Sequence, residues 1–503
     1  MKGNVSMNKF ANAARNEGNV TSTLNGAKAW STTDSKVLDL FSQIGAMRHR
    51  LNDIPDAMQS AWDENPELTM KMVFYARDIR GGLSERDVAR TAMQWLAKYH
   101  PNEMRKNLKH VAEYGRWDDL YTFVGTVLER DVFRIFREQL KADMIAMRNG
   151  KSCSLLAKWM KGVNASSKET NRLGCLTAKR LKMPIHEYRK MLSNLRKYIS
   201  VTEVDMSSNN WGDIVYEHVP SKAMNNYRNA FMRHDEVRFN GYMNKVRTGE
   251  AKINASTLFP YDLAHRYMTT SMAYDGRHYY VALNDAGPDD VVEAQWKALP
   301  NYVDGEFNAM VIADTSGSMA GQPIESALSL AIYFAERNKG PFHNLFMTFS
   351  TNPAYVSLDE QSFYGNLKKA AQAPWMGSTN LEKAFNKILK TAVDNNLRSE
   401  ELPKALIVIS DMQIDPYRCG NSSDFLDAMQ KKYASYGYEL PYIVFWCVNS
   451  FSNVCHSKYD KYCAMFSGNA TSTFRSVMQS IGSTAYEAML KTLNSERYAR
   501  ITI

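Results

Sequence analysis

The sequence has little cysteine and no long apolar run. Only six of its 503 residues are cysteines, too few for the disulfide framework of a small secreted fold. No stretch approaches the roughly 18 apolar residues that cross a bilayer. Residues Met1–Asn12 lack the apolar core of a secretory signal. We therefore expect a cytoplasmic protein that does not bind membranes.

Signatures of catalysis are also missing. The ten histidines include no His-x-x-x-His pair, there is no nucleophile elbow, and Asp78–Gly82 lacks the lysine and spacing of a phosphate-binding loop. Cys447, Cys455 and Cys463 are eight residues apart, with His456 beside them. Zinc ligands usually come in tighter pairs, so buried thiols are the better interpretation. The sequence gives no reason to expect an enzyme.

Positive charge is concentrated in one segment. The net charge is +9, and residues 151–200 alone contain 12 Lys and Arg against two acidic residues. Such a field favours a polyanionic partner, usually nucleic acid, although a solvated basic surface fits the same composition. The candidate RNA contacts are Lys158, Lys161, Lys168, Arg172, Lys179, Arg180, Lys182, His186, Arg189, Lys190, Arg196 and Lys197.

Residues 36–306 have a helical pattern. Gly81, Gly115 and Gly150 are 34 and 35 residues apart, a period that fits stacked two-helix repeats. Gly81 suits a left-handed helix end, and Ser84 suits the N-cap of the next helix.

A basic helix is expected after Pro184. Its apolar face is Tyr188, Met191, Leu192, Leu195 and Ile199, and basic residues lie opposite. Further helices are expected over Ser221–Arg247 and Pro260–Met272.

After residue 306 the pattern changes to alternating strands and helices. The expected strands are Phe307–Ala313, Leu345–Phe349, Tyr355–Leu358, Ala405–Ser410 and Tyr442–Val448. The expected helices are Ile324–Asn338, Leu381–Val393 and Phe425–Tyr433. This alternation predicts a doubly wound, Rossmann-like α/β domain, which binds ligands at the carboxyl ends of its strands.

Three loops of this domain carry oxygen ligands. The first contains Asp314, Ser316 and Ser318, the second Thr379, and the third Asp411. Two carboxylates and three hydroxyls are hard donors that suit Mg²⁺ or Mn²⁺. The Asp-x-Ser-x-Ser pattern alone would fit a helix cap, but the three loops together favour a metal site. Asp415 is better explained as a loop cap than as a ligand.

This arrangement resembles the metal-ion-dependent adhesion site of the von Willebrand factor A family. The resemblance implies that the same five residues hold Mg²⁺ (or Mn²⁺), with Asp411 acting directly or through water. In that family an acidic side chain of a protein partner fills the open coordination position. The resemblance therefore implies a binding site and not a catalytic one.

The helical half resembles the TROVE-related, Ro autoantigen-like family through Asp78–Asp87, Glu113–Leu120, Val219–Met224 and Gly249–Pro260. That family joins a ring of HEAT-like helices to a C-terminal A domain and occurs in eukaryotes, bacteria and bacteriophages. The closer likeness is to its uncharacterised bacterial and bacteriophage branch. The resemblance implies that the ring holds single-stranded or structured noncoding RNA.

The expected architecture is a multidomain α and α/β protein. It consists of a loosely ordered arm (1–35), a TROVE-like helical-repeat domain (36–306) and an A-like domain (307–503). The expected function is Ro-like RNA binding, with a protein partner at the metal site. The alternative is a structural or assembly protein, such as a bacteriophage virion component, that uses the metal site for protein contacts only. The expected location is the host cytoplasm, or the virion if the protein is phage-encoded.

Overall fold

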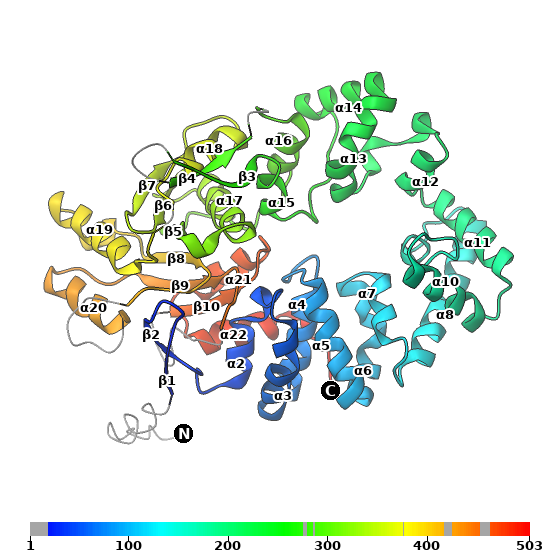
Figure 1. Ribbon diagram of the computed structural model, residues 1–503, viewed down its shortest axis with the longest axis horizontal. Helices are drawn as coiled ribbons and strands as arrows, with labels where there is room; N and C mark the ends of the chain where they lie inside the picture. Colours follow the sequence, from blue (N-terminus) through cyan, green and yellow to red (C-terminus); the bar gives the residue numbers. More distant parts are fainter. Residues whose placement is uncertain (1–18, 275–278, 285–286, 376, 417–424, 453–462) are drawn as a thin grey trace. The chain divides into compact units, whose positions relative to one another are not determined.

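The computed structural model describes residues 19–274, 279–284, 287–375, 377–416, 425–452 and 463–503 (Figure 1). The chain forms two compact units. The first, here called the sheet unit, comprises residues up to 69, 259–289 and 301–496. The second, here called the helical unit, comprises residues 70–258, 290–300 and 497–503.

A six-stranded sheet is the core of the sheet unit. Its strands are β5 (Ala309–Asp314), β6 (Leu345–Phe349), β7 (Ala354–Ser357), β8 (Ala405–Ser410), β9 (Tyr442–Cys447) and β10 (Cys463–Ser467). They lie in the order β10-β9-β8-β5-β6-β7, with parallel neighbours apart from the antiparallel pair β6 and β7. Because β5, β8, β9 and β10 are buried at every position, they form continuous apolar runs in the sequence.

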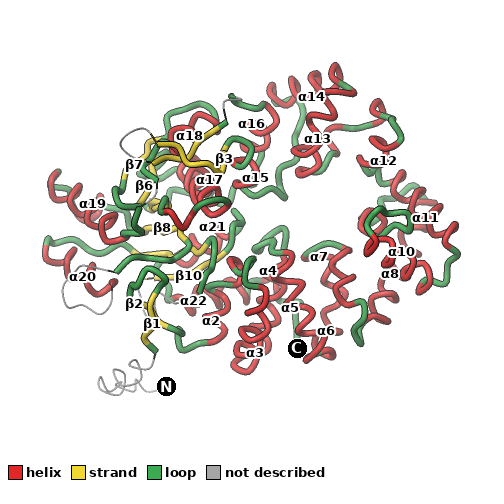
Figure 2. Tube along the Cα trace, viewed as in Figure 1, coloured by secondary structure: helices red, strands yellow, loops and turns green. Residues whose placement is uncertain are grey.

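Helices cover both faces of this sheet (Figure 2). They are α17 (Gln322–Arg337), α18 (Phe363–Ala371), α19 (Leu381–Asp394), α20 (Phe425–Ser435), α21 (Thr473–Ser480) and α22 (Ala485–Leu493). Figure 1 shows α19 and α20 on the opposite side of the strands from α17 and α21. Phe474 of α21 stacks on Tyr333 and Phe334 of α17 and meets Trp446 of β9 edge-on, with ring centroids 4.6–5.5 Å apart.

The expected strands and helices after residue 306 are confirmed, with ends that differ by at most two residues. The helix expected over Pro260–Met272 is wrong. A short helix, α15 (Pro260–Ala264), is followed by strand β3 (Met268–Tyr274), which pairs antiparallel with β4 (Tyr279–Leu283). Thr269 donates its hydroxyl to the carbonyl of Ala282 at 3.0 Å. The pairing partner and the β-branched threonine together favour a strand here.

Residues 19–69 are part of the sheet unit, which differs from the expected domain boundaries. They form the hairpin β1 (Val20–Ser22) and β2 (Lys28–Trp30), then α2 (Lys36–Phe41), 3-10 turns at Ile44–Ala46 and Leu51–Asp53, and α3 (Ile54–Glu64). A Cβ at Gly45 would lie 2.7 Å from the backbone of Ser467, so this segment packs directly against the end of β10. Residues 19–35 are thus a structured hairpin and not a loose arm, while 1–18 lie outside the described residues.

The helical unit is built from consecutive helices. They are α4 (Pro66–Arg77, from Met70 on), α5 (Arg86–Tyr99), α6 (Pro101–Asn107), α7 (Val111–Tyr114), α8 (Glu129–Arg148), α9 (Leu156–Trp159), α10 (Lys168–Arg180), α11 (Ile185–Tyr198), α12 (Thr202–Ser207), α13 (Ser221–His234), α14 (Glu236–Thr248) and α16 (Asp290–Lys297). Four 3-10 segments join them, at Leu108–His110, Trp117–Phe123, Trp211–Asp213 and Tyr216–His218.

The structure of the helical unit tests two of the helices that were predicted from the sequence. The apolar face of α11 is confirmed, because Tyr188, Met191, Leu192 and Leu195 are all buried. The helical structure expected over Ser221–Arg247 is confirmed and consists of the pair α13 and α14. They separate at Asp235, whose carboxylate accepts hydrogen bonds from Tyr216 and Arg238.

The glycines between the first helices have another role than the one expected. Gly81 and Gly115 do not adopt a left-handed conformation, whereas Ser84 does, with φ 59°. A Cβ at Gly81 would lie 2.8 Å from the Arg497 side chain, and a Cβ at Gly115 would lie 2.3 Å from a carboxylate oxygen of Asp119. These glycines make room for buried ion pairs. Gly150, which follows the end of α8, is left-handed, with φ 65°.

One of these ion pairs fixes the C-terminal tail to the helical unit. The fully buried carboxylate of Asp78 accepts hydrogen bonds from two N–H groups of Arg497 and from the Tyr498 hydroxyl. Asn107 donates to the carbonyl of Thr502 at 2.6 Å. Residues more than 380 positions apart in sequence therefore share one buried cluster.

Replacing Arg497 with Ala is expected to destabilise the helical unit strongly. The substitution leaves Asp78 as a buried charge without its cation, which costs about 3–5 kcal/mol. Urea unfolding followed by circular dichroism measures the loss. The matched control is Arg500→Ala, which removes a partner of the exposed Glu113 and should cost at most about 1 kcal/mol. Equal losses in the two variants would contradict a structural role for the Asp78 cluster.

Candidate functional site

The ends of two neighbouring strands bring the first and third candidate loops together. In the parallel pair β5 and β8, Ala313 lies opposite Ile409, so Asp314 lies beside Ser410. The chain continues from β5 to β6 on one side and from β8 to β9 on the other. This is the point of an open α/β sheet where the strand order reverses and ligands bind.

Asp314 is fully buried at this point. Its Oδ1 accepts the backbone N–H of Ser316 at 2.8 Å, and its Oδ2 accepts the hydroxyl of Ser410 at 2.5 Å. Burial raises the pKa of Asp314, and the nearby Asp411 carboxylate raises it further, against the hydrogen bonds from Ser410 and Ser316. The two carboxylates therefore repel each other when no cation lies between them.

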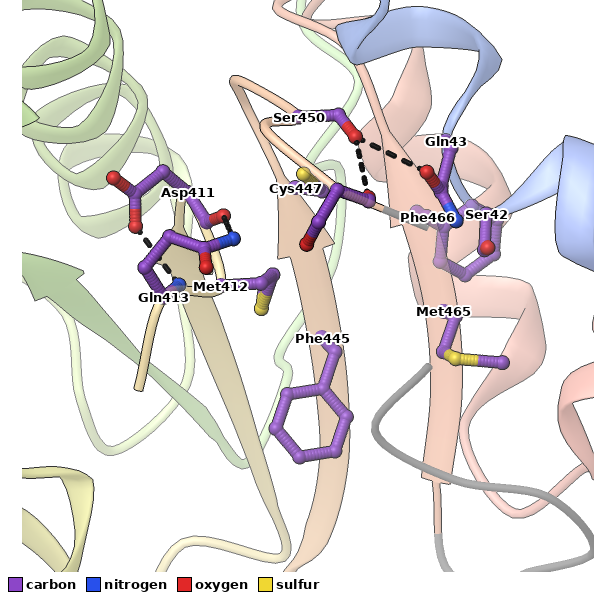
Figure 3. Close-up of a pocket in the computed structure, with 11 residues that line it drawn as sticks. Ser42, Gln43, Asp411, Met412, Gln413, Phe445, Cys447, Ser450, Met465 and Phe466 are labelled. Carbon is purple, nitrogen blue, oxygen red and sulfur yellow. Dashed lines mark hydrogen bonds between the residues drawn. The ribbon is translucent and has the colours of Figure 1, made fainter. Parts of the chain in front are cut away.

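Asp411 is also fully buried, and its carboxylate is incompletely satisfied. Its Oδ1 accepts the backbone N–H of Gln413 at 3.0 Å, whereas its Oδ2 has no hydrogen-bond partner among the described residues. Asp411 lines a pocket together with Phe445, Cys447 and Gln43, and Figure 3 shows its carboxylate pointing away from those three side chains. A buried carboxylate oxygen without a partner is costly, so a ligand beside it would stabilise the protein.

The serine hydroxyls of the first loop lie beside the two carboxylates, Ser316 at Asp314 and Ser318 at Asp411. The Oγ atoms of Ser316 and Ser318 are 3.2 Å apart. Burial raises the pKa of Asp411, while the backbone N–H of Gln413 and the nearby Ser318 hydroxyl lower it. Ser318 of the first loop therefore lies close to the third loop. Thr379 is buried, and its carbonyl accepts the backbone N–H of Asp415 at 3.0 Å. Asp415 thus joins the second loop to the third through its backbone.

This donor set fits a hard divalent cation. No group of three or more His, Cys, Asp and Glu side chains gathers as a metal site in the part of the chain that the structure describes. The loops instead offer two carboxylates with serine and threonine hydroxyls, all oxygen donors of the kind that Mg²⁺ and Mn²⁺ prefer. The unpartnered Oδ2 of Asp411 is the feature that a cation would satisfy.

Three residues at this site were not predicted from the sequence. Ser410 could have been found, because it ends a predicted strand next to Asp411. Trp375, whose indole N–H donates to the carbonyl of Ser316 at 3.2 Å, has no local signal. Asn25 lies in the N-terminal hairpin, and its amide is 3.4 Å from the Thr379 hydroxyl. Sequence patterns do not predict a contact across 354 residues.

The cysteines of the sheet unit agree with the sequence interpretation where they are described. Cys447 and Cys463 are buried in the neighbouring strands β9 and β10. Burial, followed by the Asp411 carboxylate, raises the pKa of Cys447 to about 12. Cys455 and His456 lie outside the described residues.

Most of the candidate RNA contacts are exposed on or next to α10 and α11. The exposed residues are Lys168, Arg172, Lys179, Arg180, Lys182, His186, Arg189, Lys190 and Lys197. Three of them lie beside acidic residues: Arg172 pairs with Glu169, Arg180 with Glu129, and His186 is 4.0 Å from Glu187. The remaining positive charge keeps this surface basic.

Three candidate contacts serve the fold of the helical unit. Arg196 donates to the carbonyls of Ala157 and Met160 at 2.9 and 2.7 Å, which fixes α9 against α11. Lys161 lies 3.7 Å from Asp118, and the ammonium of Lys158 lies over the Trp159 ring. Of these, Arg196 is the least suited to contact a phosphate.

A second group of cations, not found from the sequence, surrounds Asp118 and Asp119. The carboxylate of Asp119 accepts hydrogen bonds from Arg77 and Arg90, and that of Asp118 accepts them from Arg90 and Arg116. Burial opposes ionisation, but Arg116 and Arg90 hold the pKa of Asp118 below its usual range. These side chains are part of the buried framework of the helical unit.

Fold and site together define the class of this protein. It joins a helical unit with a basic surface to an α/β unit with an oxygen-rich site at its strand ends. None of the described helices is long and apolar enough to cross a bilayer.

Comparison with known proteins gives the family. Residues 23–133 and 163–304, about half of the chain, match the family model described as "Domain of unknown function (DUF2828)", and the chain belongs to this family. Residues 308–499 match a second model, "Domain of unknown function (DUF7788)". The chain is also 28% identical to "Uncharacterized protein L728" of Acanthamoeba polyphaga mimivirus, over 92% of this chain and 85% of that protein.

Proposed function

We propose that this protein binds RNA through its helical unit and a protein partner through a Mg²⁺ ion in its sheet unit. In this proposal the sheet unit is of the von Willebrand factor A type, and the helical unit is of the HEAT-like, TROVE-related type. The observation that carries the proposal is the unpartnered, buried Oδ2 of Asp411 at the strand ends. No hydrogen bond from the described residues reaches this oxygen, whereas a divalent cation would satisfy it.

The residues that would hold the cation come from all three loops. Asp314 and Asp411 supply opposite charge, and Ser316, Ser318 and Thr379 supply neutral oxygens. A bound Mg²⁺ keeps part of its coordination shell for water or for an oxygen from another molecule. A carboxylate of a protein partner is suited to that position because its oxygen is a hard donor of the kind that Mg²⁺ binds.

Support for RNA binding comes from the exposed cations of α10 and α11. Lys190 and Lys197 are both exposed on α11 and, at seven residues apart, lie on one side of the helix. The buried residues of α11 are Tyr188, Met191, Leu192 and Leu195, so Lys190 and Lys197 are not part of the core. A row of cations on a rigid helix suits the regularly spaced phosphates of a nucleic acid.

The metal proposal predicts that Mg²⁺ stabilises the protein. Mg²⁺ at a hundred times its Kd should add about 2.7 kcal/mol by mass action. Thermal unfolding of the full chain with Mg²⁺ and with EDTA measures this gain. Asp314→Ala should remove it, because the cation loses one of its two charged ligands.

The matched control for this experiment is Asp415→Ala. It removes a carboxylate from the same edge of the sheet but no proposed ligand, so it should keep the Mg²⁺ response. If Mg²⁺ stabilised the Asp314→Ala variant as much as the wild type, the proposed metal site would be excluded.

The RNA proposal predicts a specific dependence on salt. If Lys190 and Lys197 contact phosphates, each adds about 0.7 to the slope of log K against log salt on single strands. Replacing both with Gln should therefore reduce the slope by about 1.4. Fluorescence anisotropy with a labelled single-stranded RNA at several salt concentrations measures it.

Lys245→Gln with Lys252→Gln is the matched control. Both residues are exposed, lie in the helical unit and are outside the basic segment. This double variant also removes two positive charges, but it should leave the slope of log K against log salt unchanged. If both double variants lower the slope equally, binding depends on total charge and not on α11.

A preference for single-stranded over duplex RNA would distinguish the proposed RNA-binding protein from an assembly protein with an incidental basic surface. Single strands expose bases for stacking, worth about 1–3 kcal/mol each, whereas a duplex hides them. RNA with a single-stranded tail should therefore bind at least about tenfold better than a blunt duplex of equal length, or about 1.4 kcal/mol. A gel shift at physiological salt tests this. Equal binding, or a preference for the duplex, would favour the assembly protein, an interpretation that also suits a chain with a viral relative.

A further inference from the structure

The tip of the N-terminal hairpin contacts the loop that follows Asp411. Thr23 donates its hydroxyl to the carbonyl of Ile414 at 2.7 Å. The backbone N–H of Leu24 donates to the side-chain oxygen of Gln413 at 2.9 Å, and the Asn25 amide donates to the Gln413 carbonyl at 2.5 Å. Three consecutive hairpin residues thus hold two consecutive residues of the third loop.

Asn25 also reaches the second loop. Its amide nitrogen lies 3.4 Å from the hydroxyl oxygen of Thr379. One side chain therefore contacts both the loop that contains Thr379 and the loop that contains Asp411. A hydroxyl oxygen has two lone pairs, so Thr379 can accept this hydrogen bond and still bind a cation.

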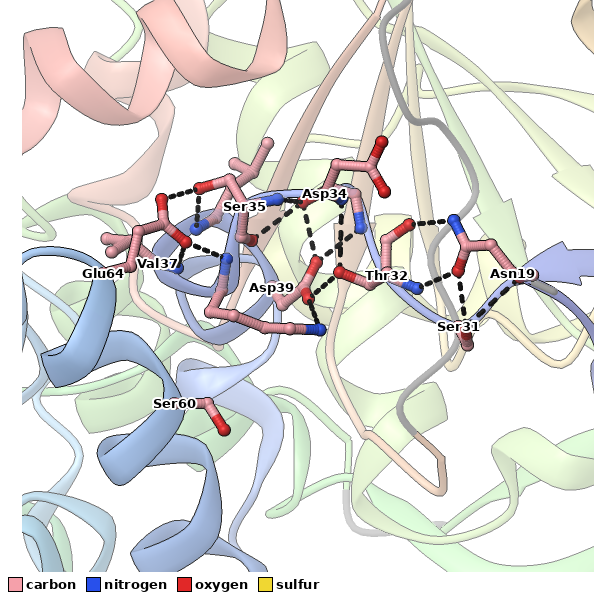
Figure 4. Close-up of polar contacts among 12 residues, drawn as sticks. Asn19, Ser31, Thr32, Asp34, Ser35, Val37, Asp39, Ser60 and Glu64 are labelled. Atoms are coloured by element: carbon pink, nitrogen blue, oxygen red, sulfur yellow. Dashed lines mark hydrogen bonds and ion pairs between the residues drawn. The ribbon is translucent and has the colours of Figure 1, made fainter. Parts of the chain in front are cut away.

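The base of the hairpin is fixed by a polar network (Figure 4). The Asp39 carboxylate accepts hydrogen bonds from Thr32 and Thr33, including the backbone N–H of Thr33 at 2.7 Å. The Glu64 carboxylate accepts the Ser35 hydroxyl at 2.6 Å and also bonds the backbone N–H groups at the start of α2. The hairpin is thus held at both ends, and its tip is not a loose extension.

The third loop has a conformation that needs such support. Met412, directly after Asp411, has φ 62°. The left-handed region is unfavourable for a non-glycine residue and persists where the surrounding structure maintains it. The bonds to Gln413 and Ile414 supply part of that support, and Asp411 is oriented by the same turn through the N–H of Gln413.

We propose that Asn25 is a positioning residue of the metal site, which joins the second and third loops so that Thr379 and Asp411 face the same cation. The inference rests on the proposed Mg²⁺ site and extends it to a segment about 290 residues before the first loop. The Asn25 side chain then belongs to the binding machinery of the sheet unit. Groups that orient metal ligands typically change metal affinity 10- to 100-fold when they are removed.

The test is Asn25→Ala in the full chain. Because Asn25 is exposed, the metal-free variant should unfold at the wild-type temperature. Its Kd for Mg²⁺, measured by calorimetry, should rise about tenfold. The matched control is Leu24→Ala at the same tip, since the Leu24 side chain is 69% exposed and only its backbone bonds to Gln413. Leu24→Ala should bind Mg²⁺ as the wild type does.

Each other outcome overturns the inference in a distinguishable way. An unchanged Kd in Asn25→Ala, with Mg²⁺ binding abolished in Asp314→Ala, would leave the metal site intact and show that Asn25 does not position it. A lower metal-free unfolding temperature with an unchanged Kd would assign Asn25 a purely structural role. If the wild type itself does not bind Mg²⁺, both the proposed function and this inference fail.

Discussion

The parallel pairing of β5 with β8 is the interaction on which the candidate site depends. It places Asp314 beside Ser410 and brings Asp411 close enough to raise the pKa of Asp314. Both carboxylates are fully buried, where repulsion between them is weakly screened. The fold therefore maintains an arrangement that is unfavourable without a cation, and such an arrangement is typical of binding sites.

In the helical unit, the buried carboxylates have cationic partners, unlike those of the candidate site. Asp78 and Asp119 are as buried as Asp314, but each has an arginine partner and additional hydrogen bonds. Gly81 and Gly115 leave the space that these pairs need. Here the charges are satisfied within the protein, so they stabilise the fold and leave no position for a ligand. The contrast with Asp411 distinguishes a structural carboxylate from a candidate ligand.

Local patterns predicted the α/β part well because its strands and helices are specified by neighbouring residues. Continuous apolar runs predicted β5, β6, β8 and β9, and apolar residues at helical spacing predicted α11. Prediction failed where a distant partner decides the structure. The stretch from Met268 became a strand because β4 pairs with it, and Gly81 faces Arg497 instead of ending a helix with a left-handed residue.

The sequence by itself determined the alternation of strands and helices, the oxygen-rich composition of the three loops, and the concentration of positive charge in residues 151–200. Each depends on residues that are close together in the chain. Only the tertiary structure decided that Asp411 has an unpartnered oxygen, that Arg196 supports α9, and that Asn25 reaches Thr379. These depend on burial and on contacts between distant segments, and the pattern of any one segment does not specify them.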